Sequence, residues 1–376
     1  MANILDYLDW RGDLSFDESP FNEVDNYILC KIGCPDYTGI VPDDGYAPID
    51  YAITRAFADN EQNLGRLAGP LLPEVLKRLP ETPRYSALML GFFALTESEE
   101  KSEQFSALTV RLPDGTRYVS FRGTDDTLIG WKENFLMGSR ETVHAQCDAL
   151  AYLKKQAEYP GKMIVGGHSK GGNLAVFAAA NCGSEIQDRI TAVYNNDGPG
   201  FYRDLYSEES FLRIRDKVHT ILSEHAIVGL MLNYDKRCSI VRSEAEGAAA
   251  HDGFRWEVKG TSFVRSEGFA PRTLILRDAI EEFEAEMPDE VRYEFTDALF
   301  GALDGMGIKT VSDLTEQKLR QGLQAVKELA KDPDVKLFVS EFIEQLIKND
   351  AEYRISKVKN LTKLPFKKRK AEAGEE

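Results

Sequence analysis

The sequence predicts an α/β protein with a mostly parallel central sheet and an added helical region toward its C-terminal end. Strand-like runs alternate with helical patterns between residues 106 and 258, which is typical of βαβ units and a parallel sheet. From Pro271 onward the pattern is helical alone. The chain has 376 residues, 43% of them hydrophobic, which is enough to bury a full core and a smaller second one.

These observations divide the chain into three parts. A main domain covers residues 1–270, a helical accessory region covers 271–356, and a basic tail covers 357–376, which we expect to be disordered and solvated. The main domain begins with a lead-in over 1–50 that is rich in Asp, Gly, Pro and aromatic residues without a sustained period, so we expect it to be ordered and loop-rich.

Hydrophobic periodicity places the elements of the main domain. Apolar residues recur at helical spacing from Asp50 to Leu79, and Pro70 and Pro73 divide that stretch into two helices. Strands are then predicted at 106–112, 117–121, 163–165, 190–194, 218–222, 239–241 and 254–258. Helices are predicted at 141–158 and 170–182, and in the accessory region at 273–287, 290–303 and 316–348.

Composition excludes several classes of protein. A net formal charge of −16 disfavours nucleic-acid binding, because most of the surface would repel phosphates. The five cysteines are widely spread and no secretory signal opens the chain, so we expect a reduced, cytoplasmic protein without structural zinc. No apolar run reaches the roughly 18 residues of a membrane span. Transient contact between the basic tail and an acidic or membrane surface is the minority alternative for that segment.

Residues 163–175 contain a pattern that predicts a nucleophilic serine. They read Met-Ile-Val-Gly-Gly-His-Ser-Lys-Gly-Gly-Asn-Leu-Ala: a strand, a G-x-S-x-G turn and a helix start rich in small residues. In a nucleophile elbow the serine lies in a strained turn, and Gly167 and Gly171 leave no Cβ to collide with the approaching backbones. A plain Gly-Ser turn is the alternative, but the flanking strand and helix favour Ser169 as a nucleophile at a helix N-terminus.

A serine nucleophile needs a general base, and the chain has five histidines. Three are less suited by position, in a helix, inside the elbow or at a strand start: His144, His168 and His219. His251 lies in the loop before the 254–258 strand, and the histidine of such a triad comes late in the chain, in a loop of this kind. We therefore favour His251 over His225 as the base.

Two carboxylates between the serine and the histidine could orient that base. Asp197 follows the 190–194 strand, and Glu224 follows the next strand. The alternative interpretations are an Asx turn for Asp197 and a solvated loop carboxylate for Glu224. We favour Asp197 and keep Glu224 as the alternative acid.

Residues 118–124 form a second motif, which points to a known family when it is taken together with the elbow. Residues 118–124 read Tyr-Val-Ser-Phe-Arg-Gly-Thr and are followed by Trp131. Together with the elbow they resemble the class 3 lipases, whose fold is the α/β hydrolase, over roughly residues 106–258. The resemblance implies an oxyanion hole at Thr124, with the backbone N–H of Lys170 as second donor.

The sequence departs from that family at the acid. Class 3 lipases carry it in a D-x-V-P-like stretch, and the similar stretch here is 226–229, with Ala226 in place of the aspartate. When the N-terminal segments 6–12 and 22–25 are included, the whole chain resembles the members of an uncharacterised bacterial lipase-like family of unknown function.

These features predict a serine hydrolase that cleaves a small-molecule or lipid ester through an acyl-enzyme on Ser169, with water as the second acceptor and no metal or organic cofactor. A thioesterase or an acyltransferase would use the same residues. A non-enzymatic interaction protein on a hydrolase scaffold is the alternative from a different class, motivated by Ala226 and the added helices.

Overall fold

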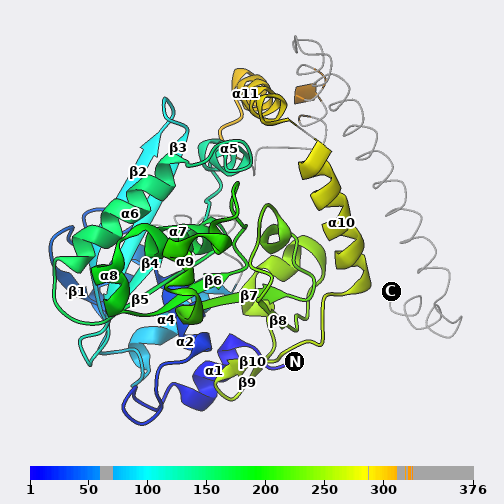
Figure 1. The fold of residues 1–376 in the computed structure, drawn as a ribbon. Helices are drawn as coiled ribbons and strands as arrows, with labels where there is room; N and C mark the ends of the chain where they lie inside the picture. Colours follow the sequence, from blue (N-terminus) through cyan, green and yellow to red (C-terminus); the bar gives the residue numbers. More distant parts are fainter. Residues whose placement is uncertain (60–70, 287, 311–317, 319–320, 323, 325–376) are drawn as a thin grey trace, which may run out of the picture. The chain divides into compact units, whose positions relative to one another are not determined.

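A computed structural model describes residues 1–59, 71–286, 288–310, 318, 321–322 and 324 (Figure 1). The chain divides into two units, and each is described by itself. The first comprises Met1–Asp289 together with Lys309–Asp313, and the second begins at Glu290. The predicted basic tail and most of the predicted 316–348 helix lie outside the described residues.

An eight-stranded mixed sheet organises the first unit, and the order of its strands in space follows their order in the sequence. The strands are β1 (Tyr46–Pro48), β2 (Met89–Ser98), β3 (Glu103–Arg111), β4 (Arg117–Phe121), β5 (Met163–His168), β6 (Ile190–Asn196), β7 (Val218–Ser223) and β8 (Ser239–Val241). The strands from β1 to β4 pair antiparallel, whereas those from β4 to β8 pair parallel. The prediction of an α/β protein with a mostly parallel sheet is therefore confirmed.

Helices cover both faces of the sheet (Figure 1). The helices of the first unit are α1 (Ile4–Arg11), α2 (Glu23–Ile32), α3 (Ile49–Asp59), α4 (Leu72–Arg78), α5 (Leu128–Leu136), α6 (His144–Ala157), α7 (Lys170–Asn181), α8 (Ser184–Arg189), α9 (Glu209–Leu212) and α10 (Pro271–Glu286). On β4, Tyr118 joins the core beneath α1 and α2, whereas the next residue, Val119, joins the core beneath α6 and α7. This alternation is the period of two expected of a strand buried on both faces. Helix α11 (Asp289–Gly305) belongs, from Glu290, to the second unit.

The sheet differs from the sequence prediction at both of its ends. Strands β1 and β2 were not predicted. In the region of β2, the run 87–95 is almost continuously apolar and carries no alternation, so the strand period is hidden. The predicted 254–258 strand is wrong. Residues Gly253–Arg255 form a 3-10 turn instead, which Asp252 caps by accepting a hydrogen bond from the Phe254 N–H, and only Val258 enters the short hairpin of β9 (Val258–Lys259) and β10 (Ser262–Phe263).

Two capped helices lie within residues 1–50, the lead-in whose sequence predicts a loop-rich segment. Asn3 caps α1 and Asn22 caps α2, and in each helix an aspartate three residues later accepts the N-cap N–H in return. The repeated Asn-x-x-Asp spacing is a sequence signal for these capping boxes. The lead-in therefore contributes two fixed helices to one face of the sheet.

A fully buried ion pair holds α2 to the segment before β2. Neither the Asp25 nor the Arg84 side chain is exposed, and the guanidinium donates to both carboxylate oxygens, at 2.8 and 2.5 Å. The Tyr7 and Tyr85 hydroxyls donate to the same carboxylate, at 2.9 and 2.6 Å. Because every partner here is buried, the network fixes the position of α2.

Asp25→Ala is expected to lower the free energy of unfolding by about 3–5 kcal/mol, because it leaves the Arg84 charge buried without its partner. Urea denaturation followed by circular dichroism measures the change. The matched control is Asp9→Ala, since Asp9 pairs with Arg78 but is 61% exposed. This control should cost less than about 1 kcal/mol. Equal losses in the two variants would contradict the assignment of Asp25 as the anchor of α2.

Candidate functional site

Ser169 occupies a strained turn between β5 and α7. Its φ of 59° is in the left-handed region, which a serine rarely adopts without a constraint from its surroundings. The two glycines that flank it leave no room for a side chain. A Cβ on Gly167 would collide with the Gly171 backbone, and one on Gly171 would collide with the Phe121 carbonyl. This is the backbone geometry that a nucleophile elbow requires.

Strand register brings the candidate residues to one edge of the sheet. His168 on β5 is paired with Asn196 on β6, so Ser169 and Asp197, the residues that follow, leave the sheet side by side. The Ser169 N–H donates to the Asn196 carbonyl at 3.0 Å, and Asp197 N–H donates to the Ile221 carbonyl at 2.9 Å. The carboxyl ends of adjacent parallel strands are where α/β folds place their ligands.

Asp197 and His251 form a hydrogen-bonded pair at this edge. The Asp197 side chain is fully buried, and its Oδ2 lies 2.7 Å from His251 Nδ1. Its other oxygen, Oδ1, has no hydrogen-bond partner among the described residues, and a Cβ built on Gly229 would lie 2.5 Å from it. The imidazole is 24% exposed. Since Nδ1 faces the carboxylate, Nε2 is the nitrogen left to exchange a proton with another group.

The His251 ring lies against the elbow. Its centroid is 4.4 Å from the centroid of the His168 ring, and His168 is the residue directly before Ser169. His168 Nε2 is 2.7 Å from the His251 main-chain oxygen. The structure therefore brings the elbow, the favoured histidine and the favoured carboxylate together.

The alternative residues have other partners. Glu224 accepts from the Ser266 hydroxyl at 2.8 Å and from the Ser243 N–H at 3.3 Å. In the described part of the chain no hydrogen bond joins Glu224 to His251. Ala226, where the resemblance to class 3 lipases predicts an aspartate, is 1% exposed within an apolar cluster that includes Leu230. The side chain at this position therefore belongs to the apolar core and supplies no acid.

The loop after β4 lies against Ser169. A Cβ on Gly123 would approach the Ser169 Cβ to 3.2 Å and the His168 carbonyl oxygen to 2.7 Å. The next residue, Thr124, exchanges side-chain hydrogen bonds with Asn134 on α5, at 2.9 and 2.7 Å. Lys170 is the first residue of α7, where a backbone N–H has no acceptor within the helix. Lys170 therefore follows the serine directly in the chain, and Thr124 follows a glycine that lies against the serine.

A buried ion pair fixes α5 to the elbow helix. Lys170 Nζ lies 3.0 Å from Glu133 Oε2, and each side chain is 1% exposed. The ammonium also donates to the Gln104 main-chain and side-chain oxygens, at 2.6 and 2.8 Å, and Glu133 accepts from the Gln104 and Ala145 N–H groups. Burial lowers the pKa of Lys170, while the Glu133 carboxylate opposes that shift. Glu133 could not be predicted from the sequence, because a glutamate within a helix carries no spacing signal.

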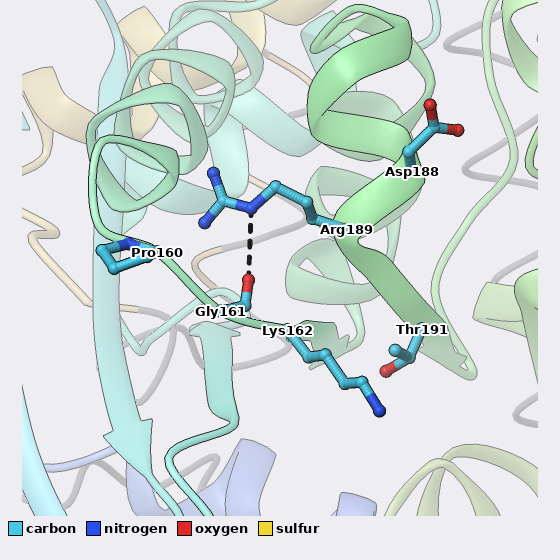
Figure 2. Close-up of a pocket in the computed structure, with 6 residues that line it drawn as sticks. All are labelled: Pro160, Gly161, Lys162, Asp188, Arg189 and Thr191. Carbon is cyan, nitrogen blue, oxygen red and sulfur yellow. Dashed lines mark hydrogen bonds between the residues drawn. The ribbon is translucent and has the colours of Figure 1, made fainter.

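A surface hollow lies at the opposite edge of the sheet, where β5 and β6 begin (Figure 2). It is lined by Pro160, Gly161, Lys162, Asp188, Arg189 and Thr191. The Arg189 guanidinium donates to the carbonyl oxygens of Gly161, Ala157 and Tyr159. Since this arginine binds the carbonyls at and beyond the end of α6, we interpret it as a cap of that helix.

Among the described residues, no group of three or more His, Cys, Asp or Glu side chains is arranged to hold a metal ion. The helices of these residues include none with the length and apolar character that crossing a membrane requires.

Comparison with known proteins places the chain in a family. A search of curated proteins found no match. The model of the Mbeg1-like family matches residues 79–301, which is more than half of the chain and includes the elbow, Asp197 and His251. The chain therefore belongs to the Mbeg1-like family, a lipase-like family of uncharacterised function.

Proposed function

We propose that the chain is a serine hydrolase with an α/β-hydrolase fold, which cleaves a carboxylic ester through an acyl-enzyme on Ser169. The observation that carries the proposal is the 2.7 Å contact between His251 and Asp197 beside a strained Ser169. A buried carboxylate on Nδ1 selects the tautomer whose Nε2 can accept a proton, which is the requirement for a general base.

In the proposed acylation step, Ser169 Oγ attacks the ester carbonyl and forms the C–O bond while its proton passes to His251 Nε2. The carbonyl oxygen becomes an oxyanion, for which the backbone N–H groups of Thr124 and Lys170 are the proposed donors. Collapse of this intermediate breaks the bond to the leaving alcohol, which takes the proton from His251. The buried Asp197 stabilises the imidazolium while it exists.

Water then completes the reaction. His251 accepts a proton from a water molecule, which attacks the acyl-enzyme, and the carboxylic acid leaves as the proton returns to Ser169 Oγ. A thiol ester or an acceptor alcohol in place of water would use the same residues, so a thioesterase or an acyltransferase remains within the proposed class. The basis for preferring hydrolysis of an ester is the lipase-like family.

The proposed triad has its acid one strand earlier than in class 3 lipases. Asp197 follows β6, whereas Ala226 lies beyond the end of β7. Because β6 and β7 are adjacent parallel strands, a carboxylate after either can approach a histidine at the same sheet edge. Two observations support this relocation: Ala226 is packed in an apolar cluster, and Asp197 Oδ2 lies 2.7 Å from His251 Nδ1.

Replacement of the base tests the proposal. His251→Gln is expected to lower kcat on p-nitrophenyl esters on the order of 10²- to 10⁴-fold, since glutamine cannot take the serine proton. His225→Gln is the matched control and should leave kcat unchanged. Esters of graded acyl length, assayed with both variants, would also define the substrate. A loss of activity in His225→Gln with full activity in His251→Gln would transfer the base role to His225.

A further inference from the structure

The side chain of His168, inside the elbow, bridges two residues that are far apart in the sequence. Its Nδ1 is 3.2 Å from Lys31 Nζ, and its Nε2 is 2.7 Å from the main-chain oxygen of His251. Lys31 lies in the last turn of α2 and is 3% exposed. The rings of Tyr27 and Phe254 lie 5.4 and 5.8 Å from its ammonium. These aromatic faces stabilise a cation that burial would otherwise disfavour.

The two contacts allow one protonation state of the His168 ring. An ammonium has only N–H donors, so Nδ1 must accept from Lys31 through its lone pair. A carbonyl oxygen has only lone pairs, so Nε2 must carry the proton and donate it to His251. Burial first, and then the Lys31 charge, hold the pKa of His168 well below its ordinary value, in keeping with a neutral ring.

Helix α2 also contacts the chain beside His251 and the chain beside Asp197. The Tyr27 hydroxyl accepts from the Gly253 N–H at 2.7 Å, two residues beyond His251. The Asn26 side chain donates to the Asn196 side-chain oxygen at 2.9 Å, one residue before Asp197. One helix, anchored by the Asp25 network, therefore contacts the chain next to each partner of the proposed acid–base pair.

We propose that His168 is a positioning residue that holds the main chain of the base His251, and that Lys31 fixes His168 in the donor tautomer. The inference rests on the proposed function. The histidine is then held at two points, by Asp197 on its ring and by His168 on its backbone. Lys31 lies in the segment before residue 79, outside the part of the chain that matches the family, so this helix supplies a component of the site that the family match does not include.

Substitutions at His168 separate positioning from packing. His168→Leu keeps an apolar side chain but has no donor, and we expect kcat to fall about 10- to 100-fold with KM within about twofold, as for a small misplacement of a reacting group. His168→Gln provides an amide acceptor and donor in place of the two ring nitrogens, and should restore most of kcat. Equal activity in the Leu variant and the wild type would overturn the inference, as would a Gln variant no better than Leu.

Lys31→Met tests the coupling. It should lower kcat in the wild-type background and have no further effect when combined with His168→Leu, because Lys31 acts through that ring. The matched control is Ile28→Val, a fully buried residue of the same helix, which should lower the melting temperature without changing kcat. If the two substitutions lower kcat by factors that multiply in the double variant, Lys31 does not act through His168. If kcat of Ile28→Val falls together with its melting temperature, the loss of kcat reflects the structure of the helix alone. Either result would overturn the inference.

A spectroscopic measurement keeps this inference distinct from the proposed function. Two-bond ¹H–¹⁵N correlation spectra of the five histidines report the tautomer of each ring, whether or not the protein hydrolyses an ester. At neutral pH, His168 should be neutral with its proton on Nε2, and Lys31→Met should introduce a population protonated at Nδ1. A proton on Nδ1 of His168 in the wild type would overturn the inference even if ester hydrolysis is found. Absence of hydrolysis with the expected tautomer would instead refute the proposed function.

Discussion

Ser169→Ala is expected to reduce kcat/KM for ester hydrolysis by a factor on the order of 10⁴ or more, while the fold is kept. The substitution removes one hydroxyl, and alanine meets the same backbone strain at a φ of 59° as serine does. Without the Oγ no acyl-enzyme can form, and only binding and the proposed oxyanion donors remain. Turnover of a p-nitrophenyl ester and the melting temperature, measured on the same purified sample, test both halves of this expectation.

The chain offers a matched control for that substitution. Ser102 is also a serine in the left-handed region, with a φ of 51°, and it lies in the turn between β2 and β3. Ser102→Ala should change neither turnover nor, beyond a small amount, melting temperature. Activity retained in purified Ser169→Ala protein would refute the serine mechanism as a whole.

Asp197→Asn is expected to lower turnover by a factor of about 10⁴ with little change in stability. If the amide nitrogen faces His251, it donates to Nδ1 and holds the tautomer whose Nε2 is already protonated. If the amide oxygen faces His251, the NH₂ group occupies the place of Oδ1, which has no hydrogen-bond partner among the described residues. In both orientations the imidazolium loses the buried negative charge that stabilises it.

Glu224→Gln is the matched control for Asp197→Asn. Glu224 accepts from a hydroxyl and from a backbone N–H, and the glutamine keeps an acceptor oxygen, so turnover should be almost unchanged. The reverse outcome, a silent Asp197→Asn and an inactive Glu224→Gln, would assign the acid to Glu224. If both variants are fully active, the site works without either carboxylate. If neither the wild type nor the variants hydrolyse an ester, an interaction protein on a hydrolase scaffold becomes the better interpretation.

The local sequence pattern was sufficient to predict the strands of the parallel part of the sheet. Strands β4 to β8 each carry a short β-rich run, and the glycines around Ser169 mark a close backbone approach that the structure contains. Strand β2 was missed because apolar residues on successive positions hide the period of two. The 254–258 segment was misassigned because its aromatic side chains are buried by a 3-10 turn, which alternation cannot distinguish from a strand.

Contacts between distant residues account for the rest of the candidate site. Nothing near Lys31 or Glu133 in the sequence indicates that one faces His168 and the other faces Lys170. Each lies on a helix whose buried face becomes defined only when that helix packs beside the sheet. The N-terminal helices could have been found from the Asn-x-x-Asp spacing at Asn3 and Asn22, but their approach to His168 could not, because it depends on tertiary packing.

Labelling with a fluorophosphonate probe tests the central proposal most directly, because the probe reacts with a serine only when a base and an oxyanion hole activate it. The folded protein would be incubated with the probe, digested, and its peptides sequenced by mass spectrometry. We expect one labelled residue, Ser169, with labelling abolished in Ser169→Ala and retained in Ser102→Ala. An unlabelled Ser169 in folded wild-type protein, or label on a different serine, would contradict the proposal that this chain is a serine hydrolase acting through Ser169.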